Sequence, residues 1–170
     1  DQGVFIGGRE REAIVVDSDC CEIKELYRKA KRSAYVSKSV KETSIINSVA
    51  FTVNNAISIE CNQPQIERFL AKLGVGDDGE VGLENFIRIR IGICRHYALA
   101  NGILLEMFRR DGYIPGKVSI DRGDDGKNAH VWCRYSSREI FILDGSVGYS
   151  GRLRDSIGND HWDYRRENER

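Results

Sequence analysis

The chain has 170 residues, and its 26 Lys and Arg balance its 26 Asp and Glu, so the formal net charge at pH 7 is zero. This balance indicates neither nucleic acid nor an anionic membrane surface as a partner. No apolar run approaches the roughly 20 residues of a membrane-spanning helix. The length and the 41% share of hydrophobic residues predict a single globular domain over residues 1–170.

The cysteines form an odd and unpatterned set. They are Cys20, Cys21, Cys61, Cys94 and Cys133. Their spacing matches neither a disulfide framework nor a zinc site. We therefore expect free thiols in a reducing compartment such as the cytoplasm, with no metal and no cofactor.

The N-terminal part of the chain predicts an arm followed by two helices. Residues 1–16 carry a short apolar run and are expected to form an edge strand or an extended arm. Apolar residues at helical spacing predict helices over about 19–37 and 41–58. Asp17, Ser18 and Asp19 are N-cap candidates for the first, whereas Asn54 and Asn55 in the second are expected at the surface or as caps.

A third helix is expected to start at Pro64 and to end at Gly74. The acidic stretch 76–80 does not have the spacing of a calcium loop and is typical of a solvated turn. A short apolar-periodic piece over 81–91 then leads to a helix over about 94–111. That helix is apolar over much of its circumference, so we expect it to be central to the fold.

The hydrophobic period then changes to two. It predicts strands over 117–120, 128–135 and 140–143, with a hairpin loop over 121–127 and a turn over 136–139. The tail after Gly151 is charged and lacks periodicity, and we expect Trp162 and Tyr164 to order part of it. The resulting class is α+β, with N-terminal helices followed by a small antiparallel sheet packed on the helix that begins at Cys94.

Cys94 has the setting of a nucleophile. Gly92 lies just ahead of it, and the exposed N–H groups of a helix start favour a thiolate. The strands that carry His130 and Asp144 are joined by a short turn, so they are expected to be antiparallel neighbours that bring these two side chains together. Cys94, His130 and Asp144 then read as nucleophile, base and orienting acid.

The remaining polar residues around this pattern have weaker assignments. The Cys94 backbone N–H would hold an oxyanion together with a second donor, for which Gln63 and Asn85 are candidates. His96 points to a different side of the helix from Cys94 and is expected to be structural or to face the substrate. Arg95 is interpreted as an exposed helix arginine.

The three motifs resemble one known superfamily. Gly92-Ile93-Cys94-Arg95-His96-Tyr97-Ala98, Ala129-His130-Val131-Trp132 and Leu143-Asp144 are similar to the signature of the transglutaminase-like superfamily. The resemblance implies a papain-like α+β fold with a circularly rearranged order, and a Cys94–His130–Asp144 triad. It places the core at about 42–149, and leaves the arm over 1–16 and the tail over 150–170 outside it.

The resemblance implies a thiol-dependent acyl-transfer enzyme that acts on protein amides through a thioester. Superfamily members include transglutaminases, glutamine deamidases, cysteine proteases and peptide N-glycanases, so transamidation or deamidation of glutamine and peptide hydrolysis stay open. The expected partner is a protein or peptide substrate. The compact chain is similar to bacterial members, some of them secreted effectors, for which the reducing compartment would be a host cytosol.

Two other hypotheses come from different classes. One is a catalytically inactive transglutaminase-like module that binds protein. The other, more remote, is a recognition module in which the Gly- and Asp-rich loop at 121–126 contacts a partner. The chain lacks the acidic calcium sites of animal transglutaminases and the zinc-binding Cys pairs of the glycanases, so the resemblance implies neither metal.

Overall fold

A computed structural model describes residues 12–35, 41–57, 62–76, 79–124, 129–157 and 162–169. The helices are α1 Cys21–Ala34, α2 Glu42–Ala56, α3 Gln63–Leu73, α4 Leu83–Ile89, α5 Cys94–Arg110, α6 Leu153–Ser156 and the 3-10 turn η1 Glu167–Glu169. The strands are β1 Ala13–Val15, β2 Glu80–Gly82, β3 Lys117–Asp124, β4 Ala129–Ser136, β5 Ile140–Asp144 and β6 Tyr149–Arg152. Residues 1–11 of the expected arm, Cys61 and the hairpin residues 125–127 lie outside the described parts.

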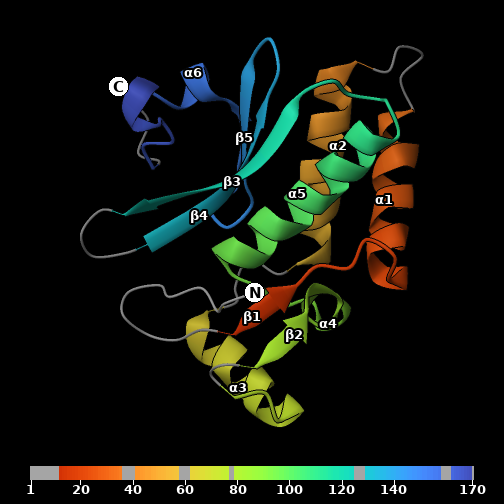
Figure 1. The fold of residues 1–170 in the computed structure, drawn as a ribbon, viewed down its shortest axis with the longest axis vertical. Coiled ribbons are helices and arrows are strands. Elements are labelled where there is room, and N and C mark those ends of the chain that lie inside the picture. Colours follow the sequence, from red (N-terminus) through yellow and green to blue (C-terminus); the bar gives the residue numbers. More distant parts are fainter. Residues whose placement is uncertain are drawn as a thin grey trace.

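The fold is α+β, as the sequence predicts. The strands β3-β4-β5-β6 form one antiparallel sheet in chain order. Helix α5 packs on one face of this sheet, and α2 and α1 pack against α5 in turn (Figure 1). The helix that starts at Cys94 is therefore central, with the sheet on one side and helices on the other.

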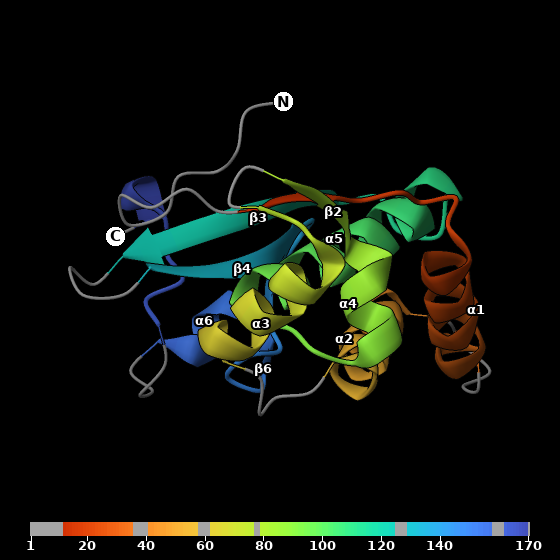
Figure 2. The ribbon, with the colours of Figure 1, turned by 90° about the horizontal axis from the view of Figure 1, so that it is seen from below.

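A smaller unit lies at the lower end of the molecule in Figure 1 and is seen face-on in Figure 2. There β1 pairs in parallel with β2, with Ile14 opposite Val81, so the predicted edge strand is confirmed. Helices α3 and α4 complete the unit. Its buried hydrophobic cluster is Ile66, Leu70, Val81 and Phe86.

The two faces of β4 have different neighbours because successive strand residues point in opposite directions. Cys133 and Tyr135 belong to the main hydrophobic core shared with α1, α2 and α5. Trp132 points the other way, into a cluster with Ile142, Leu153 and Tyr164 from β5, α6 and the C-terminal residues. The sheet is thus covered on both faces.

The sequence predictions for the hairpin and the tail need correction. Strand β3 continues to Asp124 where a loop was expected from residue 121, because Asp121 pairs with Trp132 in the register. Arg166 also donates to both Asp121 carboxylate oxygens, at 2.8 and 2.7 Å. The fourth strand β6 was not predicted and continues into the tail expected to be aperiodic, which also contains α6 and η1.

Helix ends match the predictions in part. Helix α3 has a capping box formed by Asn62 and Gln65, with Pro64 in its first turn and Gly74 as its C-cap. For α1 the prediction was wrong: Cys20 is the N-cap residue and makes no side-chain cap hydrogen bond to the described residues. The Asp17 carboxylate instead accepts from the Asp19 N–H at 2.7 Å, forming a turn ahead of the helix.

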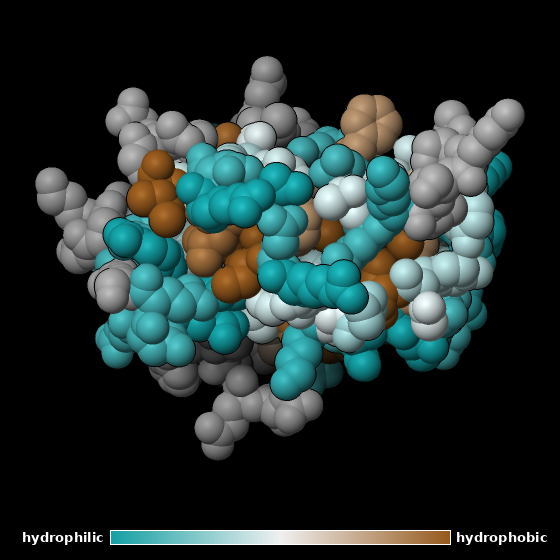
Figure 3. Space-filling view, turned by 90° about the horizontal axis from the view of Figure 1, so that it is seen from above, coloured by the Kyte–Doolittle hydropathy of each residue, from teal (hydrophilic) through white to brown (hydrophobic). Residues whose placement is uncertain are grey.

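Seen from above, hydrophobic side chains on the surface are separated by hydrophilic ones (Figure 3). The described parts contain no helix long and apolar enough to cross a membrane. Asn54 departs from its expected surface position, because its Oδ1 atom is buried without a hydrogen-bond partner within the described structure.

Candidate active site

The backbone just before α5 places Cys94 at the first helical position. Ile93 is the extended N-cap residue, and its N–H donates to His96 Nδ1 at 3.1 Å. A Cβ on Gly92 would lie 2.6 Å from Ile57 Cγ2 and 3.0 Å from His96 Cβ. Only glycine therefore allows the chain to pass this closely over α2 and then turn into α5.

Strands β4 and β5 separate at the point where Cys94 lies. Their pairing ends with Cys133 opposite Leu143, so the start of β4 has no β5 partner in the described ladder. There the Val131 backbone N–H faces the Cys94 sulfur and helps to lower the pKa of the thiol. The thiol thus occupies the edge of β4 that β5 leaves free.

His130 and Asp144 are in direct contact. His130 Nε2 lies 2.5 Å from Asp144 Oδ2, and both side chains are buried. Continuing the β4–β5 register by one step puts Trp132 opposite Asp144, so His130 reaches the carboxylate diagonally on the same face. The predicted contact between these two residues is confirmed.

His130 also links Asp144 to Cys94. Because Nε2 is engaged by Asp144, the other ring nitrogen, Nδ1, is the one that can face the thiol, and interaction with Cys94 helps to raise the pKa of His130. The structure therefore brings Cys94, His130 and Asp144 together from the start of α5, the start of β4 and the end of β5.

The two titrating members shift each other's pKa. Burial alone would raise the pKa of the Cys94 thiol, but its hydrogen bond to His130 and the imidazolium charge outweigh burial and lower it. Burial would lower the pKa of His130, but Asp144 and then Cys94 raise it to about 9. Both shifts favour the charged forms of the pair, thiolate with imidazolium.

Asp144 is fixed by more than His130. Ser146 Oγ donates to its Oδ1 atom at 2.8 Å, and the Tyr164 hydroxyl donates to Oδ2 at 3.0 Å. Asp144 is only 1% exposed. Both oxygen atoms of the buried Asp144 carboxylate therefore have hydrogen-bond partners.

Two aromatic residues of the C-terminal part contact this site. The Trp162 ring stacks on the His130 imidazole with 4.8 Å between centroids and 16° between planes, and Tyr164 reaches Asp144. Sequence reasoning expected Trp162 and Tyr164 to order the tail but did not connect them with the site. The sequence shows only that two aromatic residues stand in an otherwise charged tail. This does not indicate which residues they contact.

Arg95 is largely buried, contrary to the sequence interpretation. Its side chain is 11% exposed and forms an ion pair with Glu12, which is 3% exposed. Its Nη1 atom also donates to Gln63 Oε1 at 3.2 Å. These partners lie 83 and 32 residues away in the chain, so local periodicity could not reveal them.

Neither oxyanion candidate directs its amide N–H at Cys94 in the contacts recorded for the described residues. Gln63 Nε2 donates to Glu67 at 3.0 Å, and Asn85 Nδ2 donates to the Gly82 carbonyl at 3.2 Å. A role in the oxyanion site stays a prediction for both. His96 is fully buried against Phe86, with 4.1 Å between ring centroids, and burial holds its pKa well below the usual range.

Searches of family models, curated proteins and solved structures found no match to this chain. The described residues contain no group of three or more His, Cys, Asp or Glu side chains arranged to hold a metal ion. The chemistry of the site therefore has to be argued from its own side chains.

Proposed function

We propose that the chain is a thiol-dependent acyl-transfer enzyme with Cys94 as nucleophile, His130 as general base and acid, and Asp144 as orienting carboxylate. One observation carries the proposal: Asp144 Oδ2 lies 2.5 Å from His130 Nε2, and interaction between His130 and Cys94 lowers the pKa of the thiol and raises that of the imidazole. Cys94 stands at a helix start and its pKa is lowered, whereas the half-buried Cys20 has a pKa raised by burial.

The chemistry follows from the charge states. The Cys94 thiolate attacks the carbonyl carbon of an amide, and the His130 imidazolium gives its proton to the departing nitrogen as the carbon–nitrogen bond breaks. The Cys94 N–H belongs to the first turn of α5, where backbone N–H groups lack helical partners, and would donate to the oxyanion. Water or an amine then attacks the carbonyl carbon of the thioester and loses its proton to neutral His130. The carbon–sulfur bond breaks, which releases the acyl product and restores the Cys94 thiolate and the His130 imidazolium.

The resemblance of the three motifs to the transglutaminase-like superfamily supports protein amides as substrates and a papain-like core as the fold. Glutamine transamidation, glutamine deamidation and peptide hydrolysis share the first half-reaction. They differ in which amide is attacked and in whether water or an amine resolves the thioester. A protein or peptide is accordingly the proposed partner.

The experiment is to follow alkylation of each cysteine by iodoacetamide against pH with mass spectrometry. Cys94 is expected to react fast well below the ordinary thiol pKa of about 8.5, and His130→Ala is expected to remove this low-pH reactivity. Cys20 is the internal control because it is also half-buried but has its pKa raised. A Cys94 that reacts no faster than Cys20 would contradict the proposal and favour the inactive binding module.

Activity assays then separate the rival reactions. Incorporation of a fluorescent amine into a protein substrate indicates transamidation. The mass increase of an amide-to-acid conversion without chain cleavage indicates deamidation, and new termini indicate proteolysis. Cys94→Ala, with its fold checked by circular dichroism, is expected to abolish whichever activity is found.

A further inference from the structure

We infer that Tyr164 is a positioning residue for the Cys94–His130–Asp144 site, and that residues 162–169, here called the C-terminal segment, hold it there. This inference rests on the proposed function, because it assigns a role toward the same thiol. It adds a residue and a segment that none of the three motifs contains.

Tyr164 acts on the same oxygen as the imidazole. Its hydroxyl lies 3.0 Å from Asp144 Oδ2, the atom 2.5 Å from His130 Nε2. Burial and then the charge of Asp144 raise the pKa of the Tyr164 hydroxyl far above its usual value, so it remains a donor. With Ser146 on Oδ1, the carboxylate cannot rotate without losing a charge-assisted hydrogen bond.

The aromatic surroundings fix the Tyr164 ring. It meets Trp132 edge-on at 5.0 Å between centroids and stacks on Tyr149 at 5.6 Å. Tyr164 is 1% exposed. Two residues earlier, Trp162 stacks on His130, so the C-terminal segment contacts both the imidazole and the carboxylate.

A buried arginine anchors the segment to the sheet. Arg134 on β4 is 2% exposed and forms ion pairs with Glu169 and with Asp121, the latter at 3.7 Å. It also donates to the Tyr164 carbonyl at 3.5 Å. Removing one partner of a buried ion pair is costly because it leaves a charge uncompensated. Docking of the segment and neutralisation of Arg134 therefore depend on each other.

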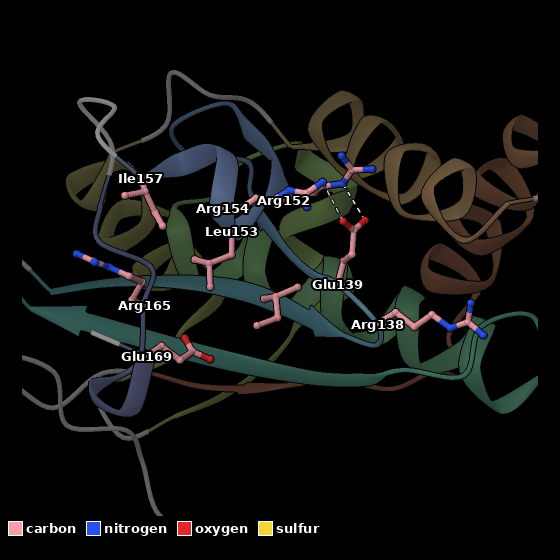
Figure 4. A pocket seen from close by; sticks show the side chains of 9 residues that line it. Arg138, Glu139, Arg152, Leu153, Arg154, Ile157, Arg165 and Glu169 are labelled. Atoms are coloured by element: carbon pink, nitrogen blue, oxygen red, sulfur yellow. Dashed lines mark ion pairs between the residues drawn. The ribbon is translucent and has the colours of Figure 1, made fainter.

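A cavity of about 380 Å³ lies on the other side of the segment. Arg165 and Glu169 line it from the segment, opposite Leu153 of α6 and the adjacent Ile157 (Figure 4). The C-terminal segment therefore does not pack fully against α6 on this side. The ion pairs of Arg134 and the aromatic contacts of Trp162 and Tyr164 are then the main interactions that hold the segment on the sheet.

The first test compares Tyr164→Phe with Tyr149→Phe by the pH profile of Cys94 alkylation. Without its hydroxyl, Asp144 is held less firmly toward His130, the imidazolium is stabilised less, and the thiolate forms at higher pH. We expect the Tyr164→Phe inflection to rise by about half a pH unit or more, roughly a threefold loss of thiolate below it. Tyr149 donates to the Arg152 carbonyl, so its variant should leave the profile unchanged.

The second test leaves every atom of the site in place. Glu169→Gln weakens the anchor on Arg134 and is expected to move the Cys94 profile in the same direction as Tyr164→Phe. Glu167→Gln removes the same charge from an exposed residue of the same turn and is the matched control. This comparison also covers the case in which Tyr164→Phe fails to fold.

The outcomes separate the two proposals. If Cys94 of the unmodified chain reacts no faster than Cys20, the proposed function fails. If Cys94 does react at low pH but Tyr164→Phe follows the same curve or shifts downward, the positioning role of Tyr164 is overturned. If Tyr164→Phe shifts the curve and Glu169→Gln does not, the role of the C-terminal segment as its anchor is overturned.

Discussion

At the scale of single residues, the site combines burial with complete pairing. Asp144 is 1% exposed and accepts from His130, Ser146 and Tyr164. The interactions with Asp144 and then with Cys94 raise the pKa of His130 against the effect of burial. The contacts that hold Asp144 in place therefore also affect the pKa of His130.

This arrangement predicts a pH dependence of stability. The folded-state pKa of His130 is about 9, above the ordinary value of about 6.5, so its contribution is present below pH 6.5 and is lost as pH rises toward 9. Cys94 has the opposite sign, because a lowered thiol pKa adds stability as pH rises. Cys94→Ala removes the opposing contribution of the thiol. In this variant the free energy of unfolding, measured in urea, should fall as pH rises from about 6.5 to about 9. In Cys94→Ala/His130→Gln the fall should be smaller, and equal slopes would contradict the assignment.

A second residue-scale prediction concerns the buried ion pair beside Cys94. Glu12→Gln leaves Arg95 buried without its counter-charge, so we expect a loss on the order of 3 kcal/mol in the free energy of unfolding. The charge of Arg95 lowers the pKa of Cys94, and removing Glu12 strengthens this effect. The variant should thus be less stable while its Cys94 reacts at lower pH, as denaturation and alkylation will show.

The matched control for Glu12→Gln is Glu22→Gln. Glu22 pairs with Arg88, whose side chain is 60% exposed. Loss of such a surface pair is expected to change the free energy of unfolding by less than about 1 kcal/mol, and it should leave the Cys94 profile unchanged. Equal effects of the two variants would show that the Glu12–Arg95 pair has no special coupling to the thiol.

At the scale of elements, periodicity and turn length carried much of the prediction. The helix start at Cys94 followed from Gly92 and the apolar periodicity after it. The contact between His130 and Asp144 followed from a short turn between two strands, because a hairpin dictates which ends meet. The extension of β3 to Asp124 could not follow from local preference, since Gly and Asp disfavour strands. It depends on pairing with β4 and on Arg166 from the chain end.

The contacts of Arg95 and Tyr164 were beyond the sequence for a related reason. Each depends on a partner at least 20 residues away, and local periodicity carries no information on a partner so distant in the chain. The triad could be predicted because its elements are joined by a tight connection or begin at a helix cap. The residues that support it come from segments whose docking only the folded chain defines.

A further prediction concerns Gly145, which follows β5 at the point where the chain leaves the sheet. A Cβ there would lie 2.3 Å from both Asn54 Oδ1 and Tyr97 Cδ1, so the residue after Asp144 packs directly on α2 and α5. We expect Gly145→Ala to lower the free energy of unfolding by about 1–3 kcal/mol through overpacking. The measurement is urea denaturation followed by circular dichroism.

Gly76→Ala is the control for this substitution. A Cβ at Gly76 has no heavy atom within 4 Å among the described residues. The change is expected to stay within about 0.5 kcal/mol of the original stability. A Gly145→Ala variant as stable as Gly76→Ala would mean that the corner can move away from α2 and α5, and that the position of Asp144 is less constrained than the packing indicates.

At the scale of the whole molecule, the site lies where three hydrophobic clusters meet. Ile93, just before Cys94, packs on the small cluster of α3, α4 and β2, whereas Tyr97, one turn later, belongs to the main core. His130 adjoins Trp132, which belongs to the cluster beneath the C-terminal segment. The geometry of the triad therefore depends on how these three clusters are held together.

The clusters differ greatly in size, and this predicts unequal local stability. The α3 unit buries Ile66, Leu70, Val81 and Phe86, while α2 and α5 share the much larger main core. Because local opening is easiest where few apolar side chains are buried, amides of α3 should exchange with deuterium at lower free energy than those of α2 and α5. Native-state hydrogen exchange by mass spectrometry measures this directly.

We expect the free energy of exchange of α3 to be lower than that of α2 and α5 by about 2 kcal/mol or more. Equal protection would show that the unit opens only with the whole fold. Since Gln63 of α3 contacts Arg95 beside the thiol, easier opening of α3 than of α2 and α5 would affect a residue next to the proposed nucleophile.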